Sequence, residues 1–480
     1  MKEYPLFING VYRACLSTRT ANSLNPATGE VFASVHQAGI DDAMLALDIA
    51  EIAFASWKQM LPSQRESIFL KAADIIDSRA DELRDVLIDE AGSTQLKAGY
   101  EVHHAASFVR GMAGVCRRVM GSTFNSDYPG VKSYCIRRPL GVVFSIAPFN
   151  FPLLLGLRKI GWALAAGNCV LLKPSEVTPV MGLKIAEIFT QAGLPDGVLN
   201  VIPGDATEFG EALIADKRIK KVTFTGSTRV GKIIAVQAAK HLKKFTLELG
   251  GKSPLVILDD IDIDYAVNVA AFSNFMHQGQ VCMTGSRIIV EQGIYEEFCK
   301  RFALKVAELK VGSPREPGVI IGPLIRPSQP EFIQGLVEGA VNEGAVLLTG
   351  GEHYDSYYLP TVLKNVTQTM KIFRTECFGP VASVIKAKDH LHALGLANDS
   401  EYGLSAALLT NDLNKAMLLS EEIESGMVHI NGPTVRDEAV VPFGGVKNSG
   451  FGREGGQYAM DEFTELKWIT IQTGQQQFPF

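Results

Sequence analysis

Short apolar runs alternate with stretches of helical length from residue 141 onward, and this alternation limits the folds that the chain can adopt. The runs VVFSI, NCVLL, VLNVI and KVTF are separated by helical stretches such as 181–192 and 230–242. Strands that alternate with helices indicate βαβ units, in which parallel strands are joined by right-handed crossovers. The sequence therefore predicts an α/β protein built on a parallel sheet.

A second α/β domain is predicted after Gly250-Gly251. The alternation starts again there with PLVIL, a helical stretch near 262–274, and RIIV. The glycine pair is the expected linker. Roughly the first 120 residues are expected to be helical after a short strand-and-turn entry. A chain of 480 residues has room for two or three domains.

Composition and charge exclude some classes of function. With 46% hydrophobic and 20% charged residues and a net charge of -6, the chain is typical of soluble globular proteins. No general affinity for nucleic acid or anionic membranes is expected, although a local basic pocket for one phosphate-bearing ligand stays open. The most hydrophobic stretch, 141–172, is interrupted by Pro148, Pro152, Arg158 and Lys159, so no membrane span is expected.

The cysteines indicate a reducing compartment. Seven cysteines are an odd number with no paired spacing, and the N-terminal MKEYPLFING lacks the basic and long apolar regions of a signal peptide. A cytoplasmic protein is therefore expected. No CxxC or HExxH motif occurs, and the adjacent His103 and His104 would point apart on a helix, so no metal site is expected.

The segment KVTFTGSTRVGKIIAVQAAK is the first candidate for nucleotide binding. Gly226, Ser227 and Gly231 lie in a strand–turn–helix segment that would aim backbone N–H groups and the positive helix end at a phosphate. The GxGxxG fingerprint is absent, and Ile233 replaces the Ser/Thr of a P-loop. A glycine-permitted turn without a ligand stays open, and ATP binding is the weaker alternative.

The segment NCVLLKPSEVTP is the second candidate. Lys173 ends an apolar strand, and Pro174 turns the chain before Glu176. Lys173 could neutralise a phosphate or bond a ribose hydroxyl, while Glu176 could accept from a ribose diol. A carboxylate there favours NAD over NADP because it repels a 2′-phosphate. The alternative is a solvated lysine and a glutamate that stabilises the first turn of a helix.

Cys282 lies in GQVCMTGSR, among small, polar and cationic neighbours. A cysteine used only for packing favours apolar surroundings, whereas a reactive one needs access and support for its thiolate. This context indicates a nucleophile. His277 is the obvious partner for a cysteine hydrolase, but closeness in sequence does not establish such a pair.

Two further residues are candidates for catalysis. Glu248 leaves a strand just before Gly250-Gly251, and active sites commonly form at the carboxyl ends of parallel strands. Asn150 lies in a turn between Pro148 and Pro152, where its amide would suit an oxyanion. A surface glutamate, and an asparagine that bonds its own turn, are the alternatives.

The ordered set of motifs resembles the aldehyde dehydrogenase superfamily over nearly the whole chain. The motifs run from NPATGE through PFNFP, LLKPSE, FTGST, LELGGKSP, GQVC and ECFGP to PFGGVKNSGFGREGG. The resemblance implies a Rossmann-type NAD-binding domain (1–117 and 139–250), an α/β catalytic domain (251–450) and a small β oligomerisation arm (118–138 and 463–480).

The resemblance also assigns roles to individual residues. It implies that Cys282 is the nucleophile, that Glu248 is the general base, and that Asn150 forms the oxyanion hole with the backbone N–H of Cys282. Glu248 further favours water over coenzyme A as acyl acceptor. The expected contacts with NAD, or with NADP, include the adenosine ribose (Lys173, Glu176), the pyrophosphate (Gly226, Ser227), the nicotinamide ribose and ring (Glu376, Phe378), and also Ile146, Pro148, Ser175, Gly231 and Leu249.

The substrate is expected to be an aromatic aldehyde. The segments HINGPTV and GQVCMTGSR resemble the corresponding sequences of the benzaldehyde, salicylaldehyde and vanillin dehydrogenase branch. Arg158 is expected to engage a ring hydroxyl or another polar group, with helix capping or pairing with a nearby acid as an equal alternative. A semialdehyde that carries a carboxylate is the rival substrate. The residues expected at the aldehyde entrance are Phe149, Phe151, Arg158 and Arg436.

The expected partner, besides the aldehyde, is a second copy of the chain. The segment 119–136 and the C-terminal LKWITIQT are similar to the paired oligomerisation strands of the family, and an unpaired strand edge needs a partner. A homodimer or homotetramer is therefore expected. A cysteine hydrolase without nicotinamide and an ATP-binding P-loop protein remain as alternatives of other classes.

Overall fold

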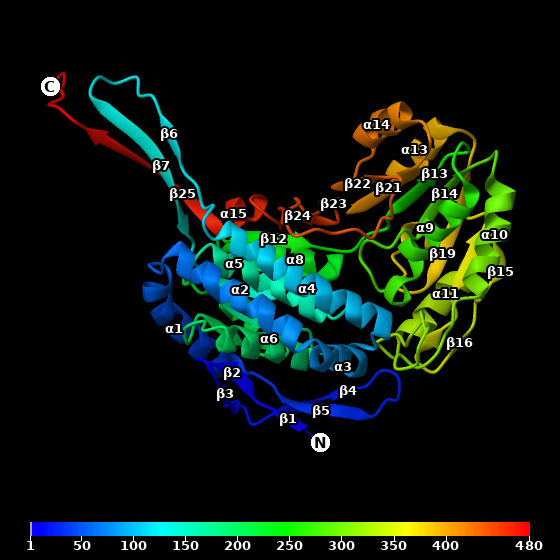
Figure 1. Cartoon of the computed structure of the whole chain (residues 1–480), viewed down its shortest axis with the longest axis horizontal. Helices are drawn as coiled ribbons and strands as arrows, with labels where there is room; N and C mark the ends of the chain where they lie inside the picture. Colours follow the sequence, from blue (N-terminus) through cyan, green and yellow to red (C-terminus); the bar gives the residue numbers. More distant parts are fainter. Residues whose placement is uncertain (1) are drawn as a thin grey trace.

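A computed structural model describes residues 2–480, which form two open sheets with their helices and one projecting β arm (Figure 1). The α/β class predicted from the alternation of strands and helices is confirmed. Residues 40–115 are mostly helical after an entry of five short strands, as expected. The boundaries of the predicted domains remain a prediction.

The first sheet is parallel at its centre, from β12 to β10, and antiparallel at both edges. All five residues of β8 and of β9 are buried, as expected of strands covered on both faces. In order across the sheet, the strands are β24 (Gly450–Phe451), β12 (Lys244–Glu248), β11 (Ile219–Thr225), β8 (Val142–Ile146), β9 (Cys169–Lys173), β10 (Leu199–Val201), β2 (Leu6–Ile8) and β3 (Val11–Arg13).

The helices of the first sheet include α5, which is buried along its whole length between the sheet and α4. The set comprises α1 (Ile40–Trp57), α2 (Pro62–Ser78), α3 (Ala80–Ala91), α4 (Gln95–Val115), α5 (Pro152–Ala165), α6 (Pro179–Gln191), α7 (Ala206–Ala215) and α8 (Thr228–Lys240). A small sheet beside them contains β1 (Lys2–Tyr4), β5 (Val31–His36) and β4 (Thr20–Leu24).

The second sheet is parallel except for the edge strand β15. Its order is β15 (Val346–Thr349), β18 (Thr361–Lys364), β19 (Val381–Ala387), β14 (Arg287–Glu291), β13 (Pro254–Ile257), β21 (Ser405–Leu409) and β22 (Met427–Ile430). Its helices are α9 (Ile263–Phe275), α10 (Tyr295–Ala307), α11 (Gln329–Asn342), α12 (Lys371–Arg374), α13 (His390–Asn398) and α14 (Leu413–Glu422). Two short antiparallel pairs lie outside this sheet: the hairpin of β16 (His353–Tyr354) with β17 (Tyr357–Tyr358), and β20 (Tyr402–Gly403) with β23 (Val446–Lys447).

The chain returns to the first sheet after it has built the second. β24 pairs antiparallel with β12, so that Gly450 lies opposite Glu248. The following helix, α15 (Tyr458–Phe463), contacts α5. The edge of the first sheet that carries Glu248 is thus completed by residues from near the C-terminus.

The arm is a three-stranded antiparallel sheet that extends away from the body (Figure 1). β25 (Thr464–Gln472) pairs along its whole length with β7 (Val131–Pro139), and β6 (Ser122–Phe124) lies on the other side of β7. Among residues 2–480, no helix is both long and apolar enough to cross a membrane.

Candidate functional site

The predicted catalytic residues come from loops where the two sheets meet. Glu248 ends β12, and Asn150 lies between β8 and α5. Cys282 follows a short 3-10 helix, Met276–Gly279, that leads toward β14. Asn150 and Cys282 line one cavity of about 430 Å³, open mouth included, with mostly apolar companions: Tyr100, Phe151, Leu154, Leu155, Val281, Met283, Val435, Arg436, Asp437 and Phe443.

The loop before Cys282 is held in a strained conformation. His277 and Gln278 both have positive φ, at 50° and 55°, which is costly for residues other than glycine. The side-chain Nε2 of Gln278 donates to the carbonyls of Pro323 and Gly92, at 2.9 and 3.2 Å. These two bonds hold the loop that precedes Cys282 in place.

Asn150 is bound to the same loop. Its Nδ2 donates to the carbonyl of Gln280 over 2.9 Å, and the side-chain Oε1 of Gln280 accepts from the backbone N–H of Ile325 over 3.1 Å. An amide nitrogen carries two N–H groups, so one remains to stabilise negative charge in the cavity that Asn150 shares with Cys282.

The thiol of Cys282 is protonated in this environment. Burial raises the pKa of Cys282 to about 12, and the carboxylates of Glu376 and Glu248 raise it further, while Arg158 opposes them. A nucleophilic thiolate therefore needs positive charge that the described residues do not supply. The positive nicotinamide ring of an oxidised cofactor would supply that charge.

Glu248 is a buried carboxyl whose two oxygens have no hydrogen-bond partner within residues 2–480. Burial raises the pKa of Glu248 well above its ordinary value, and the nearby Glu454 adds to the rise. The opposing charges come from Lys159, Arg158 and Arg453. A carboxyl with a raised pKa and free oxygens suits a general base that works near neutral pH.

Lys159 and Glu454 form a buried ion pair behind Glu248. Lys159 Nζ lies 2.7 Å from Glu454 Oε1, which also accepts from the hydroxyl of Thr223 over 2.7 Å. Burial alone would raise the pKa of Glu454, but Lys159 and Thr223 together hold it below its ordinary value. Sequence reasoning missed this pair because its members are 295 positions apart.

The turn between β11 and α8 has the form of a phosphate site. Ser227 is the N-cap of α8 and accepts from the backbone N–H of Val230. Gly231 has a packing reason for its lack of a side chain, because a Cβ there would lie 2.4 Å from Leu249 Cδ2. Gly226 and Ser227 thus precede the N-terminus of α8, and Gly231 in its first turn packs against Leu249; their contact with a cofactor stays a prediction.

The second predicted segment is continuous with this edge of the sheet. Ile146 and Lys173 are register partners at the ends of β8 and β9. Ser175 Oγ lies 3.5 Å from the carboxylate of Glu176, and Pro148 follows in the loop after β8. Lys173 Nζ lies 3.5 Å from Glu176 Oε2. An ammonium and a carboxylate so placed can bond ribose hydroxyls.

Glu376 and Phe378 face this region from the second sheet. Glu376 Oε1 accepts from the backbone N–H of Gly251 over 3.0 Å, and a Cβ on Gly250 would lie 2.3 Å from its other oxygen. Burial raises the pKa of Glu376 to about 7. Phe378, at φ 47°, meets Phe149 edge to face with ring centroids 5.7 Å apart.

Arg158 is buried rather than exposed at the entrance. Its guanidinium donates to the carboxylate of Asp437 and lies over the rings of Phe443 and Phe108, at 4.2 and 4.9 Å from their centroids. Pairing with a neighbouring acid, one of the two expectations, is therefore present. Asp437 and Phe443 line the cavity, so Arg158 lies directly behind its wall, and Asp437 is a site residue that sequence reasoning missed.

The other entrance residues divide into two groups. Phe151 and Arg436 line the cavity; Arg436 is exposed and pairs with Glu438 over 3.2 Å. Phe149, also expected at the entrance, is not among the residues around this cavity; it packs against Phe378, and the guanidinium of Arg326 lies over its ring.

His277 does not form a dyad with the cysteine. Its ring packs edge to face on Phe151, and neither ring nitrogen has a hydrogen-bond partner in the described part of the chain. Burial lowers the pKa of His277 well below its ordinary value. This geometry disfavours the cysteine-hydrolase alternative.

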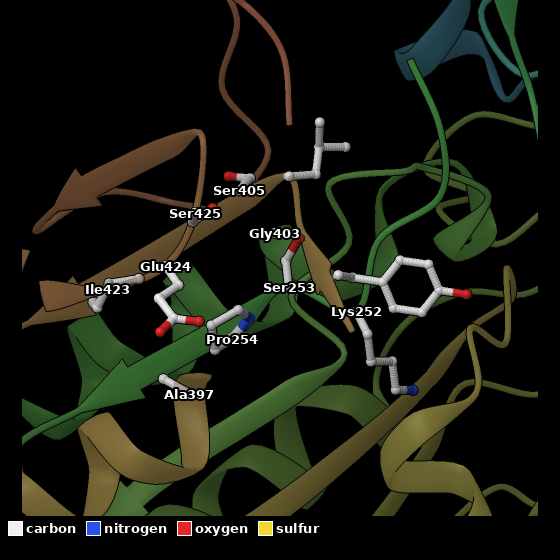
Figure 2. Close-up of a pocket in the computed structure, with 11 residues that line it drawn as sticks. Lys252, Ser253, Pro254, Ala397, Gly403, Ser405, Ile423, Glu424 and Ser425 are labelled. Atoms are coloured by element: carbon white, nitrogen blue, oxygen red, sulfur yellow. The ribbon is translucent and has the colours of Figure 1, made fainter. Parts of the chain in front are cut away.

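A second cavity lies where β13, β21 and β22 of the second sheet begin, and none of the predicted catalytic residues lines it. It has a volume of about 220 Å³, and Lys252, Ser253, Gly403, Ser405 and Glu424 are among the residues around it. Figure 2 shows the side chain of Lys252 extending away from that of Glu424. Within residues 2–480, no group of three or more His, Cys, Asp or Glu side chains could hold a metal ion.

The residues present fit a dinucleotide. Lys173 and Glu176 follow β9, Ser227 begins α8 after β11, and Glu376 bonds the backbone of Gly251 after β12, so these groups lie at the carboxyl edge of the first sheet. Lysine, carboxylates and a helix N-terminus at the carboxyl edge of a parallel sheet, with a thiol in the same protein, are typical of the class of nucleotide-dependent oxidoreductases. The sequence profile described as "Aldehyde dehydrogenase family" matches residues 13–469. The chain belongs to this family, and it is an NAD(P)-dependent aldehyde dehydrogenase.

Individual relatives are similar over their full length. A vanillin dehydrogenase of Pseudomonas fluorescens is 42% identical, with 100% of both chains covered. The crystal structure of a salicylaldehyde dehydrogenase from Pseudomonas putida G7 complexed with salicylaldehyde has a TM-score of 0.98 and 41% identity, again with 100% of both chains covered. The NAD+ complex of an aldehyde dehydrogenase from Bacillus cereus has a TM-score of 0.96 and 35% identity, and covers 98% of this chain and 97% of that one.

Proposed function

We propose that the chain oxidises an aromatic aldehyde to the carboxylic acid, with Cys282 as nucleophile, Asn150 as oxyanion donor and Glu248 as general base. The observation that carries the proposal is the cavity that Cys282 and Asn150 share. Its walls are mostly aromatic and aliphatic side chains, including Tyr100, Phe151 and Phe443. Such a cavity favours a flat apolar ring.

The first chemical step belongs to Cys282 and Asn150. The thiolate attacks the aldehyde carbon, and the free N–H of Asn150, with the backbone N–H of Cys282, stabilises the oxygen anion that develops. Preorganised donors of this kind are typically worth about 10² to 10³ in rate each. Bound NAD(P) supplies the acceptor for the hydride that leaves this carbon, and a thioester on Cys282 results.

The second step belongs to Glu248. Its unpartnered carboxylate accepts a proton from water, which then attacks the thioester and releases the carboxylic acid. General-base help is typically worth about 10² to 10⁴ in rate. A buried base of this kind supports water, and not coenzyme A, as the acyl acceptor.

The pair of Arg158 and Asp437 supports an aromatic substrate that carries a hydroxyl group. Arg158 Nε and Nη1 and Asp437 Oδ1 are buried without hydrogen-bond partners within residues 2–480, so a polar group on the ring could bond one of them. A semialdehyde carboxylate is less well suited, because Asp437 already balances the charge of Arg158 and Glu438 that of Arg436.

The test measures formation of reduced nicotinamide with NAD and with NADP. Benzaldehyde, hydroxylated benzaldehydes, succinic semialdehyde and a short aliphatic aldehyde serve as substrates, and Cys282→Ala as the inactive control. The aromatic aldehydes should give the highest kcat/KM. Arg158→Leu should reduce the preference for hydroxylated over plain benzaldehyde. Faster turnover of the semialdehyde than of every aromatic member would contradict the proposal.

We also infer a homo-oligomer and a reducing, cytoplasmic setting. The arm supports the first inference, because its strands carry exposed apolar side chains that include Phe124, Leu466, Trp468 and Ile471. The cysteines support the second, since all seven are free thiols in the described structure.

A further inference from the structure

Arg326 extends to Glu176, the residue expected to bind the adenosine ribose. It lies in the loop before α11, and its Nη2 donates to Glu176 Oε1 over 2.7 Å. The other oxygen, Oε2, lies 3.5 Å from Lys173 Nζ. Each oxygen of Glu176 is therefore next to a cation, Lys173 at the end of β9 and Arg326 in the loop before α11.

A second contact helps to hold Arg326 in this position. Its guanidinium lies 5.6 Å from the centroid of the Phe149 ring, within the range of cation–π attraction. Phe149 itself packs on Phe378. Arg326 thus lies above the aromatic pair and extends to Glu176.

The ion pair alters what Glu176 can do for each coenzyme. The ribose diol of NAD would donate to the carboxylate of Glu176, but Arg326 already donates to one oxygen of that carboxylate. In NADP a 2′-phosphate would meet a carboxylate whose charge is offset by Lys173 and Arg326. Asp205, the N-cap of α7, also attracts the ammonium of Lys173, which opposes the lowering of its pKa by burial. The carboxylate of Asp205 accepts a hydrogen bond from the backbone N–H of Thr207.

The ion pair is weak enough to exchange when a coenzyme binds. The side chains of Arg326 and Glu176 are 49% and 52% exposed, and exposed pairs change an equilibrium constant by at most about fivefold. A guanidinium also binds phosphate through paired N–H groups. Only Nη2 of Arg326 donates to Glu176, so its other N–H groups can bind a phosphate.

We propose that Arg326 determines coenzyme selectivity. It lowers the affinity for NAD because it competes for Glu176, and it raises the affinity for NADP because it supplies a cation to the 2′-phosphate. The enzyme then binds both coenzymes despite a carboxylate at the adenosine ribose. The inference rests on the proposed placement of that ribose at Lys173 and Glu176.

The test measures dissociation constants by isothermal titration calorimetry for wild type and Arg326→Gln. The probes are NAD, NADP, adenosine 5′-monophosphate and adenosine 2′,5′-bisphosphate, so that no turnover is involved. In the variant, the Kd for NAD should fall by about two- to fivefold. The Kd values for NADP and the bisphosphate should rise by about tenfold or more.

Arg315→Gln is the matched control. Arg315 is 51% exposed and pairs with Asp85 and Asp89 rather than with Glu176, so all four Kd values should stay unchanged. In a Glu176→Gln background, Arg326→Gln should no longer lower the Kd for NAD, because the carboxylate for which Arg326 and the ribose diol compete is gone.

Three results would overturn the inference. They are equal changes in the Kd values for NAD and NADP in Arg326→Gln, no change in either Kd, and changes in Arg315→Gln as large as those in Arg326→Gln. Wild-type protein that binds none of the four probes would overturn the proposed function as well, which separates the two failures.

Discussion

At the scale of single residues, the thiol of Cys282 has a pKa that works against its proposed role. With a pKa raised to about 12 by burial and carboxylates, the free protein holds almost no thiolate at neutral pH. We expect the rate of Cys282 alkylation by iodoacetamide to rise with pH up to pH 10 without a plateau, and to increase at pH 7.5 when NAD is added. The alkylation rate of Cys282→Ala is subtracted to correct for the reaction of the other six thiols. A plateau with a midpoint below about 8.5, the value of an unperturbed cysteine, would contradict this expectation.

Replacement of Glu248 separates the two chemical steps. Glu248→Gln should still form the thioester but lose the base that activates water. We expect a burst of reduced nicotinamide of about one equivalent per subunit, followed by a steady rate about 10² to 10⁴ lower. Stopped-flow absorbance measures both phases. If burst and steady rate fall together, Glu248 acts before the thioester forms.

The same substitution should affect stability with a definite pH dependence. The pKa of Glu248 is raised in the folded state. Above the unfolded value, near 4.3, the unfolded chain therefore binds fewer protons, and stability falls as pH rises. Glu248→Gln removes this loss, so it should raise Tm relative to wild type at pH 8 and have a smaller effect at pH 4.5. Calorimetry at both pH values checks the sign; an equal effect at each would refute it.

At the scale of elements, α5 carries two adjacent cations into two different buried ion pairs. Arg158 pairs with Asp437, and Lys159 with Glu454, so one helix is tied twice to the chain segment after β22. Removing one member of a buried pair leaves a charge without a partner. Such a substitution typically lowers the free energy of unfolding by about 3–5 kcal/mol, whereas replacing both members with apolar residues often leaves it unchanged.

We therefore expect Asp437→Leu to lower the free energy of unfolding by about 3–5 kcal/mol, and Arg158→Met with Asp437→Leu to recover most of the loss. Urea unfolding followed by fluorescence measures both. If the double variant is as unstable as the sum of its single substitutions, the two side chains do not act as a pair.

The elements also show which parts of the site the sequence could predict. Cys282, Glu248 and Asn150 each lie in a short motif next to a strand end, and parallel strands bring their carboxyl ends to one edge. The contacts Glu176–Arg326, Arg158–Asp437 and Lys159–Glu454 join residues 150, 279 and 295 positions apart. No local pattern encodes such pairs, which is why Arg158 was expected at the entrance and is found behind the cavity wall.

At the scale of the whole molecule, the arm should determine assembly. Leu466 and Trp468 lie two apart on β25 and so share one face; Trp468 is 71% exposed. Glutamates at both positions should convert the oligomer to smaller species in sedimentation velocity. Leu418→Glu on α14, at a site 70% exposed, is the control and should leave the assembly intact. Wild-type protein that sediments as a monomer would contradict the proposed oligomer.

The return of the chain to β12 has a consequence for synthesis on the ribosome. The strand that closes the first sheet emerges about 200 residues after Glu248, which at ~5–20 residues per second is a delay of about 10–40 s. During that interval the edge of β12 is open and Lys159 has no Glu454 to pair with. The first sheet of the nascent protein must therefore stay incomplete, with the edge of β12 exposed to chaperones, until β24 has been translated.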